Sequence, residues 1–149
     1  MIIEAQAGAI VQNLQQAAID VGLVYPVNLA SKGSCQLGGN ISTNAGGLKL
    51  IHYGGTREQV LGLEIVLPDG EILDMNTSLR KNNTGYDLKQ LFIGAEGTLG
   101  IITKATMKLA RKPRNIQVAC LGLRDFDRVV NVIGACNLNG LEVMALEFF

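Results

Sequence analysis

The chain has 149 residues, the size of one ordinary domain. Its 13 Lys and Arg residues balance its 13 Asp and Glu residues, so no overall charge favours nucleic acid or an acidic membrane surface as a partner. No run of about 18 apolar residues occurs, so we expect no membrane span.

The sequence predicts a first helix after Gly8. Apolar residues recur there at helical spacing, and Gly22 fits the position just past the C-terminus. This apolar face consists of Val11, Leu14, Ala17, Ala18 and Val21. The apolar segment 23–27 follows, and its Pro26 favours extended backbone. We therefore expect one helix and then an extended path.

The first glycine-rich stretch, Ser34–Gly47, sets its glycines among hydroxyl and amide side chains and contains no acidic residue. Glycine backbone can approach a flat or phosphorylated ligand closely and can take a positive φ, which we expect at Gly39. Ser, Thr and Asn add compact donors, and successive N–H groups in such turns can form an anion-binding nest. The combination suits a nucleotide pyrophosphate held by dipoles. Ordinary turn glycines are the alternative.

Residues 61–75 predict a β-hairpin. Apolar residues alternate from Leu61 to Leu67, Pro68-Asp69-Gly70 is a strong turn signal, and 71–75 can return as the second strand.

A polar segment, 76–84, follows and predicts a surface loop. Asp87 can then cap a short helix that ends at Gly94. The second glycine-rich stretch, Ile93–Thr103, has Glu96 as its only acidic residue. Like the first stretch, it combines glycine with short polar side chains, which strengthens the interpretation as a nucleotide site.

Residues 101–109 predict a strand with one buried face. The alternation places Lys104, Thr106 and Lys108 on the solvent side and Ala105, Met107 and Leu109 on the core side.

The basic segment 110–115 contains a proline and breaks both periodicities, so we expect a boundary between modules there. Beyond it the pattern predicts a strand over 116–121, then a helix, then a strand over 141–148. The predicted helix has Phe126, Val129, Val130 and Ile133 on one face. This βαβ-like unit is too short to bury a core of its own. We therefore expect a partial cofactor-binding domain over 1–112 and the beginning of a second domain over 113–149.

The first and last residues of the chain both resemble strands already under way, so we expect a piece of a longer protein. Cys35, Cys120 and Cys136 have no C-x-x-C spacing, and His52 is the only histidine, so the sequence predicts neither a zinc site nor a disulfide scaffold. Reduced thiols favour a cytoplasmic location. Neither a Rossmann G-x-G-x-x-G after a strand nor a P-loop G-K-[ST] occurs.

Three segments together resemble the FAD-linked oxidases and dehydrogenases of the vanillyl-alcohol-oxidase type, which share the PCMH-type FAD-binding domain. They are Ala30–Leu48, Tyr53-Gly54 and Asn83–Gly94, and their pattern is most similar to the D-2-hydroxy-acid dehydrogenase branch. Ala95 and His52 depart from it, because the family often has Ser and Arg there. The resemblance implies an α+β fold: the second lobe of the FAD-binding domain, an antiparallel-rich sheet with flanking helices, followed by the start of a ferredoxin-like substrate domain.

The resemblance also implies non-covalent FAD as the cofactor and assigns its contacts to both glycine-rich stretches. The expected cofactor-binding residues are Ser31, Gly33, Ser34, Cys35, Gly38, Gly39, Asn40, Ser42, Thr43, Asn44, Gly46, Glu96, Gly97, Gly100, Ile101 and Ile102. Two roles stay open, because Cys35 could equally be a small packing residue and Glu96 could bond either a ribose hydroxyl or local N–H groups. His52 is expected to be structural or peripheral to the flavin, not a general base.

The activity implied is oxidation of a D-2-hydroxy acid, of the 2-hydroxyglutarate or lactate type, by hydride transfer to flavin. The base, the metal ligands and the substrate clamp are expected outside this chain, so no catalytic residue and no metal ligand is predicted in it. The expected partners are the remaining parts of the polypeptide, a small D-2-hydroxy acid and, for the whole protein, a possible second copy. The isolated chain is expected to be inactive and not to retain FAD. The alternative is a non-catalytic structural or interaction module whose glycines only shape turns.

Overall fold

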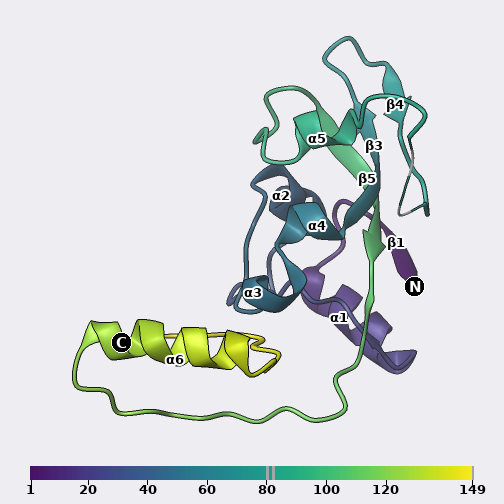
Figure 1. Cartoon of the computed structure of the whole chain (residues 1–149). Coiled ribbons are helices and arrows are strands. Elements are labelled where there is room, and N and C mark those ends of the chain that lie inside the picture. The colour runs from purple at the N-terminus through teal and green to yellow at the C-terminus, as the bar shows by residue number, and fades with distance from the viewer. Residues whose placement is uncertain (80, 82, 149) are drawn as a thin grey trace.

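A computed structural model describes residues 1–79, 81 and 83–148 of the chain. Its centre is a four-stranded antiparallel sheet of order β1-β5-β3-β4 (Figure 1). The strands are β1 (Ile2–Gln6), β3 (Val60–Val66), β4 (Ile72–Asp74) and β5 (Ile101–Lys108). Helices flank this sheet, which confirms the predicted α+β class with an antiparallel sheet.

The central strands β3 and β5 carry the core, as their alternation predicts. Leu63, Ile65, Ala105 and Met107 are fully buried, because both strands have a neighbour on each side and helices over one face. The prediction that Thr106 faces solvent is wrong. Thr106 is also buried, and its hydroxyl lies 3.2 Å from Oδ1 of Asn76, which covers the second face of the sheet.

Helix α1 (Val11–Asp20) confirms the first predicted helix. Its Val11, Leu14 and Ala18 are buried against the core, and Gly22 follows with a φ of 73°. The prediction is wrong for Ala17 and Val21, which are exposed. Strand β2 (Leu23–Val24) then pairs with β6 (Ala110–Arg111) as a small second sheet. The basic segment therefore leaves the folded body only after Arg111.

The first glycine-rich stretch contains a helix that its glycines did not predict, α2 (Leu37–Ser42). Leu37 and Ile41 are one helical turn apart and both are fully buried, so burial of this apolar pair overrides the low helix propensity of the glycines between them. Two single-turn helices follow, α3 (Leu50–Tyr53) and α4 (Thr56–Gln59).

The predicted hairpin forms from β3 and β4, with Gly70 at a φ of 88° in its turn. Helix α5 (Lys89–Phe92) confirms the short helix before the second glycine-rich stretch, and Gly94 follows it with a φ of 83°. The predicted capping role of Asp87 is wrong. The Asp87 carboxylate instead accepts from the Lys89 ammonium and the Gln90 side-chain amide, and no side chain caps this helix.

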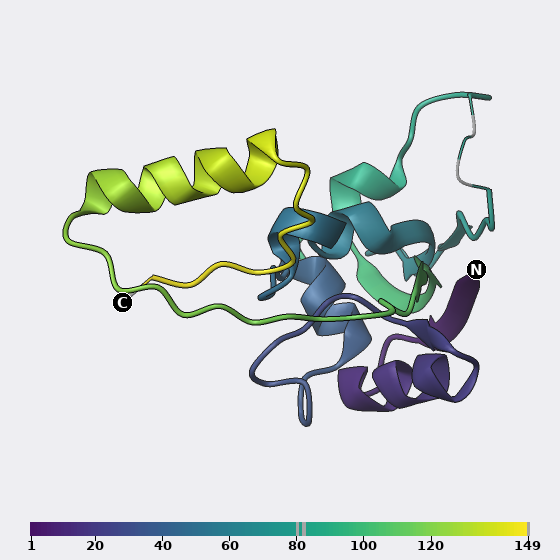
Figure 2. The same cartoon turned by 60° about the horizontal axis from the view of Figure 1, so that its bottom comes forward.

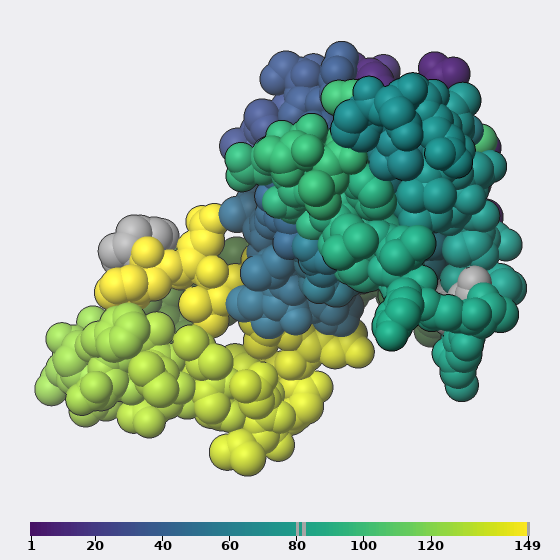
Figure 3. Space-filling model, turned by 90° about the horizontal axis from the view of Figure 1, so that it is seen from above, coloured from purple at the N-terminus to yellow at the C-terminus, as the bar shows by residue number. Residues whose placement is uncertain are grey.

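The residues after Arg111 run away from the sheet and fold back along helix α6 (Phe126–Leu138), which Asp125 caps by accepting from the Arg128 N–H (Figure 2). The predicted strands over 116–121 and 141–148 are wrong for the described residues, where both segments lack a neighbouring strand. A strand requires a hydrogen-bonded ladder, which an apolar pattern alone does not supply. The segment forms a separate lobe beside the body (Figure 3).

No helix in the described part of the chain is both long and apolar enough to cross a membrane.

Candidate cofactor-binding site

The two glycine-rich stretches meet at one hollow of about 240 Å³. Three segments line it: the turn after β1, helix α2, and the turn that leads into β5. The lining residues are Ala7, Gly8, Gln36, Gly38, Gly39, Ser42, Gly97, Gly100, Ile101 and Ile102. None of these residues carries a charged side chain, so a ligand here meets backbone, hydroxyl, amide and apolar groups.

Backbone hydrogen bonds hold the two stretches together. The Gly94 N–H donates to the Ile41 carbonyl at 3.1 Å, and the Glu96 N–H donates to the Ser42 carbonyl at 2.9 Å. Glu96 takes a left-handed φ of 52° at this point, which turns the chain back toward β5. The end of α2 and the second glycine-rich stretch thus form one continuous backbone surface.

Three glycines leave open space at the hollow. All three line the hollow, and a Cβ placed on Gly8, Gly39 or Gly97 would meet no atom within 4 Å. This is the geometry that lets a flat or phosphorylated group lie against the main chain. The predicted positive φ at Gly39 is wrong, because Gly39 has helical backbone; Gly97 has a φ of 79°. These open glycines fit an FAD ligand.

Two other predicted glycines are explained by packing. A Cβ on Gly38 would lie 2.6 Å from Cβ of Ala7, and one on Gly100 would lie 2.7 Å from Cγ2 of Ile65. Both distances are far below van der Waals contact, so glycine at these positions lets α2 sit against the turn after β1 and lets β5 start against β3. They shape the hollow by bringing its walls together.

Several predicted donors already have local partners. The Asn40 side-chain amide donates to Cys35 Sγ at 3.4 Å, and the Thr43 hydroxyl donates to the Gly39 carbonyl at 3.0 Å. Asn44 has a left-handed φ of 48°, and its Oδ1 accepts from the Arg57 N–H at 3.1 Å. These side chains stabilise the shape of the stretch, and Asn40 is buried.

Four further predicted residues lie outside the hollow, as do Cys35, Asn40, Thr43, Asn44 and Glu96. Ser31, Gly33 and Ser34 belong to the loop before α2, where the Ser34 hydroxyl donates to the Ser31 carbonyl at 3.2 Å. The Lys32 carbonyl accepts from the Gln12 N–H, which fixes this loop on α1. Gly46 is exposed beyond α2. Contact with FAD stays a prediction for these residues and equally for the predicted residues that line the hollow.

Sequence reasoning missed one wall of the hollow, formed by Ala7 and Gly8, and also missed Gln36. Gly8 directly after a strand was the available signal, since glycine at such a position allows close backbone approach. Ala7 is positioned by pairing, because its N–H donates to the Thr103 carbonyl at 2.8 Å and its carbonyl accepts from Gly38.

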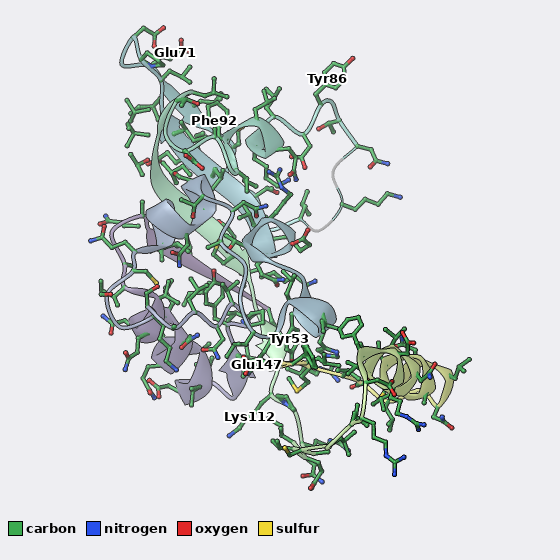
Figure 4. The ribbon with its side chains drawn as sticks, turned by 90° about the vertical axis from the view of Figure 1, so that its left-hand side faces the viewer. Tyr53, Glu71, Tyr86, Phe92, Lys112 and Glu147 are labelled. Atoms are coloured by element: carbon green, nitrogen blue, oxygen red, sulfur yellow. The ribbon has the colours of Figure 1, made fainter. Side chains whose placement is uncertain are left out.

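A second hollow, of about 550 Å³, lies between β4 and the loop that precedes α5. Charged groups border it, and Lys89 pairs with Asp87 at 2.5 Å there. The hydrogen bond from Lys89 lowers the pKa of the Asp87 carboxyl below its ordinary range. Tyr86 points away from the body at this edge (Figure 4). Charged side chains thus border this larger hollow, and it lies apart from α2.

His52 and Tyr53 lie in α3, away from both hollows, with ring centroids 4.3 Å apart. Tyr53 faces the C-terminal segment (Figure 4), and burial, followed by the nearby Glu142 carboxylate, raises the pKa of its phenol. No group of three or more His, Cys, Asp and Glu side chains in the described ranges could hold a metal ion.

The fold and the hollow agree with one class of protein. The family model described as an FAD binding domain matches residues 1–76, which is half of the chain. The chain belongs to this FAD-binding family. The match confirms the resemblance stated from the motifs and FAD as the family's cofactor.

Particular relatives narrow the comparison. The chain is 53% identical over 144 residues to D-2-hydroxyglutarate dehydrogenase of Stutzerimonas stutzeri, covering 97% of this chain and 31% of that protein. It is 48% identical over 148 residues to the mitochondrial D-2-hydroxyglutarate dehydrogenase of Danio rerio, covering 99% and 28%. An alkyldihydroxyacetonephosphate synthase structure matches with a TM-score of 0.66 and 28% identity, over 77% of this chain and 22% of that one. The chain spans less than a third of each of these proteins.

Proposed function

We propose that this chain is the cofactor-binding part of an FAD-dependent dehydrogenase that oxidises a D-2-hydroxy acid of the 2-hydroxyglutarate or lactate type. The observation that carries the proposal is the meeting of both glycine-rich stretches at one uncharged hollow with open glycine backbone. Relatives named D-2-hydroxyglutarate dehydrogenase, at 48–53% identity, support 2-hydroxyglutarate as the first substrate to test.

Within the proposal, Gly39 and Gly97 offer bare backbone to the cofactor, and Ser42 adds a hydroxyl. Ile101 and Ile102 offer main-chain groups and an apolar surface at the start of β5. When bound, FAD supplies the hydride acceptor for oxidation of the substrate α-carbon. The residues of this chain bind and orient the cofactor, and we assign proton removal from the substrate hydroxyl to residues elsewhere in the longer polypeptide.

The size of the hollow supports a shared site. Ligand pockets usually enclose roughly 300–1,000 Å³, whereas this hollow has about 240 Å³ and FAD is a large ligand. We therefore propose that this chain provides one wall and that the rest of the polypeptide provides the other. In the same proposal residues 1–112 belong to the FAD domain and 113–149 open a substrate domain.

The proposed compartment is the cytoplasm, as the sequence suggests, although several relatives carry the word mitochondrial in their names. Imaging of the full-length protein fused to a fluorescent label would separate the two locations.

The proposed activity is tested on the full-length protein that contains this chain. The purified protein should be yellow, and D-2-hydroxyglutarate added without oxygen should bleach its visible flavin bands. L-2-Hydroxyglutarate is the matched control, since it differs only in the configuration of the reacting carbon, and D-lactate tests the second substrate. A colourless protein would favour the non-catalytic module, and a yellow protein that no D-2-hydroxy acid bleaches would contradict the substrate class.

A further inference from the structure

Arg57 joins helix α4 to the end of α2 and to the second glycine-rich stretch, the two segments whose other residues line the smaller hollow. It lies in the single-turn helix α4, half-buried, and its main-chain N–H donates to Oδ1 of Asn44 at 3.1 Å. Its neighbour Thr56 adds a second link to the same segment, since the Thr56 hydroxyl donates to the Ala45 carbonyl at 2.6 Å. Helix α4 is thereby fixed to the residues that follow α2.

The Arg57 side chain extends toward the second glycine-rich stretch. Its Nη1 donates to the Gln90 carbonyl at 3.1 Å and to Gln90 Oε1 at 2.6 Å. Its Nη2 donates to the Ile93 carbonyl, directly before Gly94. A Cβ placed on Gly94 would lie 3.4 Å from both Nη2 and Cβ of Asn44, so the three residues are in close contact.

Neutral oxygens accept all the side-chain hydrogen bonds that the structure gives to the half-buried Arg57 guanidinium. In the part of the chain that the structure describes, no carboxylate lies within 4.0 Å of the Arg57 guanidinium, and carbonyl and amide oxygens satisfy it. Carbonyl oxygens at the end of a short helix need donors, and a planar guanidinium can serve several in a fixed geometry. Arg57 therefore holds the backbone at Gln90 and Ile93 in place through hydrogen bonds, and it forms no ion pair with the described residues.

We propose that Arg57 is a positioning residue for the FAD site. It fixes the turn at 93–97 relative to the end of α2, so that Gly97 and Gly39 face one hollow. This inference rests on the proposed function, because it assigns the hollow to FAD. Lysine cannot replace the arginine fully, since one ammonium cannot reproduce a planar fork that bonds Gln90 and Ile93 together.

The test measures FAD affinity and thermal stability of the full-length protein, with flavin removed and added back. Arg57→Ala should weaken FAD binding at least tenfold, and Arg57→Lys should recover only part of the loss. Leu14→Ala is the matched control: Leu14 is buried in α1 and lies outside the hollow, so this variant should lower the unfolding temperature while FAD affinity stays within about twofold. Lys104→Gln removes a cation that lies beside Glu4 and Glu64 on the sheet and should change neither quantity strongly.

The outcomes separate this inference from the proposed function. Wild-type protein that binds FAD, with Arg57→Ala binding it equally well, would overturn the positioning role alone. The same conclusion would follow if Leu14→Ala lost as much FAD affinity as Arg57→Ala at equal loss of stability. Wild-type protein that does not bind FAD would overturn the proposed function and this inference together.

Discussion

Glycines that look alike in the sequence have different roles in the structure. Gly38 and Gly39 are adjacent in α2, yet a Cβ on the first would collide with Ala7 and a Cβ on the second would extend into open space. Gly100 resembles Gly38, because Ile65 leaves no room for a side chain there. Some glycines therefore allow the segments around the hollow to pack closely, and others leave free space beside the hollow.

This difference predicts opposite effects of one substitution at two neighbouring positions. Gly38→Ala should destabilise the fold by about 1–3 kcal/mol, the usual range for overpacking, because the contact at 2.6 Å is with Cβ of Ala7, next to the main chain. Gly39→Ala should leave stability unchanged or raise it by about 0.5–1 kcal/mol, since alanine favours helix over glycine. Thermal unfolding of both variants is the measurement, and equal stability of the two would contradict the assignment.

At the scale of helices and strands, the sequence predicts the elements whose apolar residues follow a local helical or strand periodicity. The apolar alternation in β3 and β5 and the helical spacing in α1 predict most of the residues that face the core, although Ala17 and Val21 are exposed. Helix α2 could not be predicted, because Gly38 and Gly39 favour a turn locally and only burial of Leu37 and Ile41 against the sheet makes it helical. The solvent side assigned to Thr106 failed for a related reason, since Asn76 covers it from a distant segment.

The candidate site also combines features that local sequence predicts with features that depend on contacts between distant segments. Both glycine-rich stretches could be found from composition, but their meeting depends on the Gly94–Ile41 and Glu96–Ser42 backbone hydrogen bonds, which no local pattern encodes. The wall formed by Ala7 and Gly8 was missed because strand pairing brings it there.

The segment after β6 predicts an early site of proteolysis. Arg111, Lys112 and Arg114 are exposed, whereas Lys104 and Lys108 belong to the central strand β5. Trypsin should therefore cut the full-length protein after Arg114, or after Arg111 at the end of the two-residue strand β6, before it cuts in β5, because the segment beyond β6 has no sheet pairing to lose. Mass spectrometry of the first products gives the answer. Early products that end at Lys104 or Lys108 would count against a module boundary here.

At the scale of the whole molecule, the hollow is open to one side of the chain. Ile101, which lines it, is 63% exposed, and the α6 segment forms a separate lobe (Figure 3). A large ligand that rests on one wall makes only part of its contacts. Loss of about 4 kcal/mol of contact energy weakens binding roughly a thousandfold.

The isolated 149-residue chain should therefore be colourless and inactive toward D-2-hydroxy acids. Calorimetric titration of the chain with FAD should show no stoichiometric binding at low micromolar concentration, whereas the full-length protein should retain FAD through purification. Tight binding by the isolated chain would show that one wall is sufficient and that the shared-site account is wrong.

The most direct test of the central claim, that the two glycine-rich stretches form the FAD site, is the flavin content of full-length Gly39→Val. Valine fits a helix no worse than glycine and would add a side chain at a residue that lines the hollow and has open space beside it, so the account predicts a folded protein that has lost its bound FAD. Circular dichroism checks the fold, and visible absorbance measures the flavin. A folded variant that purifies with a full complement of FAD would contradict the account.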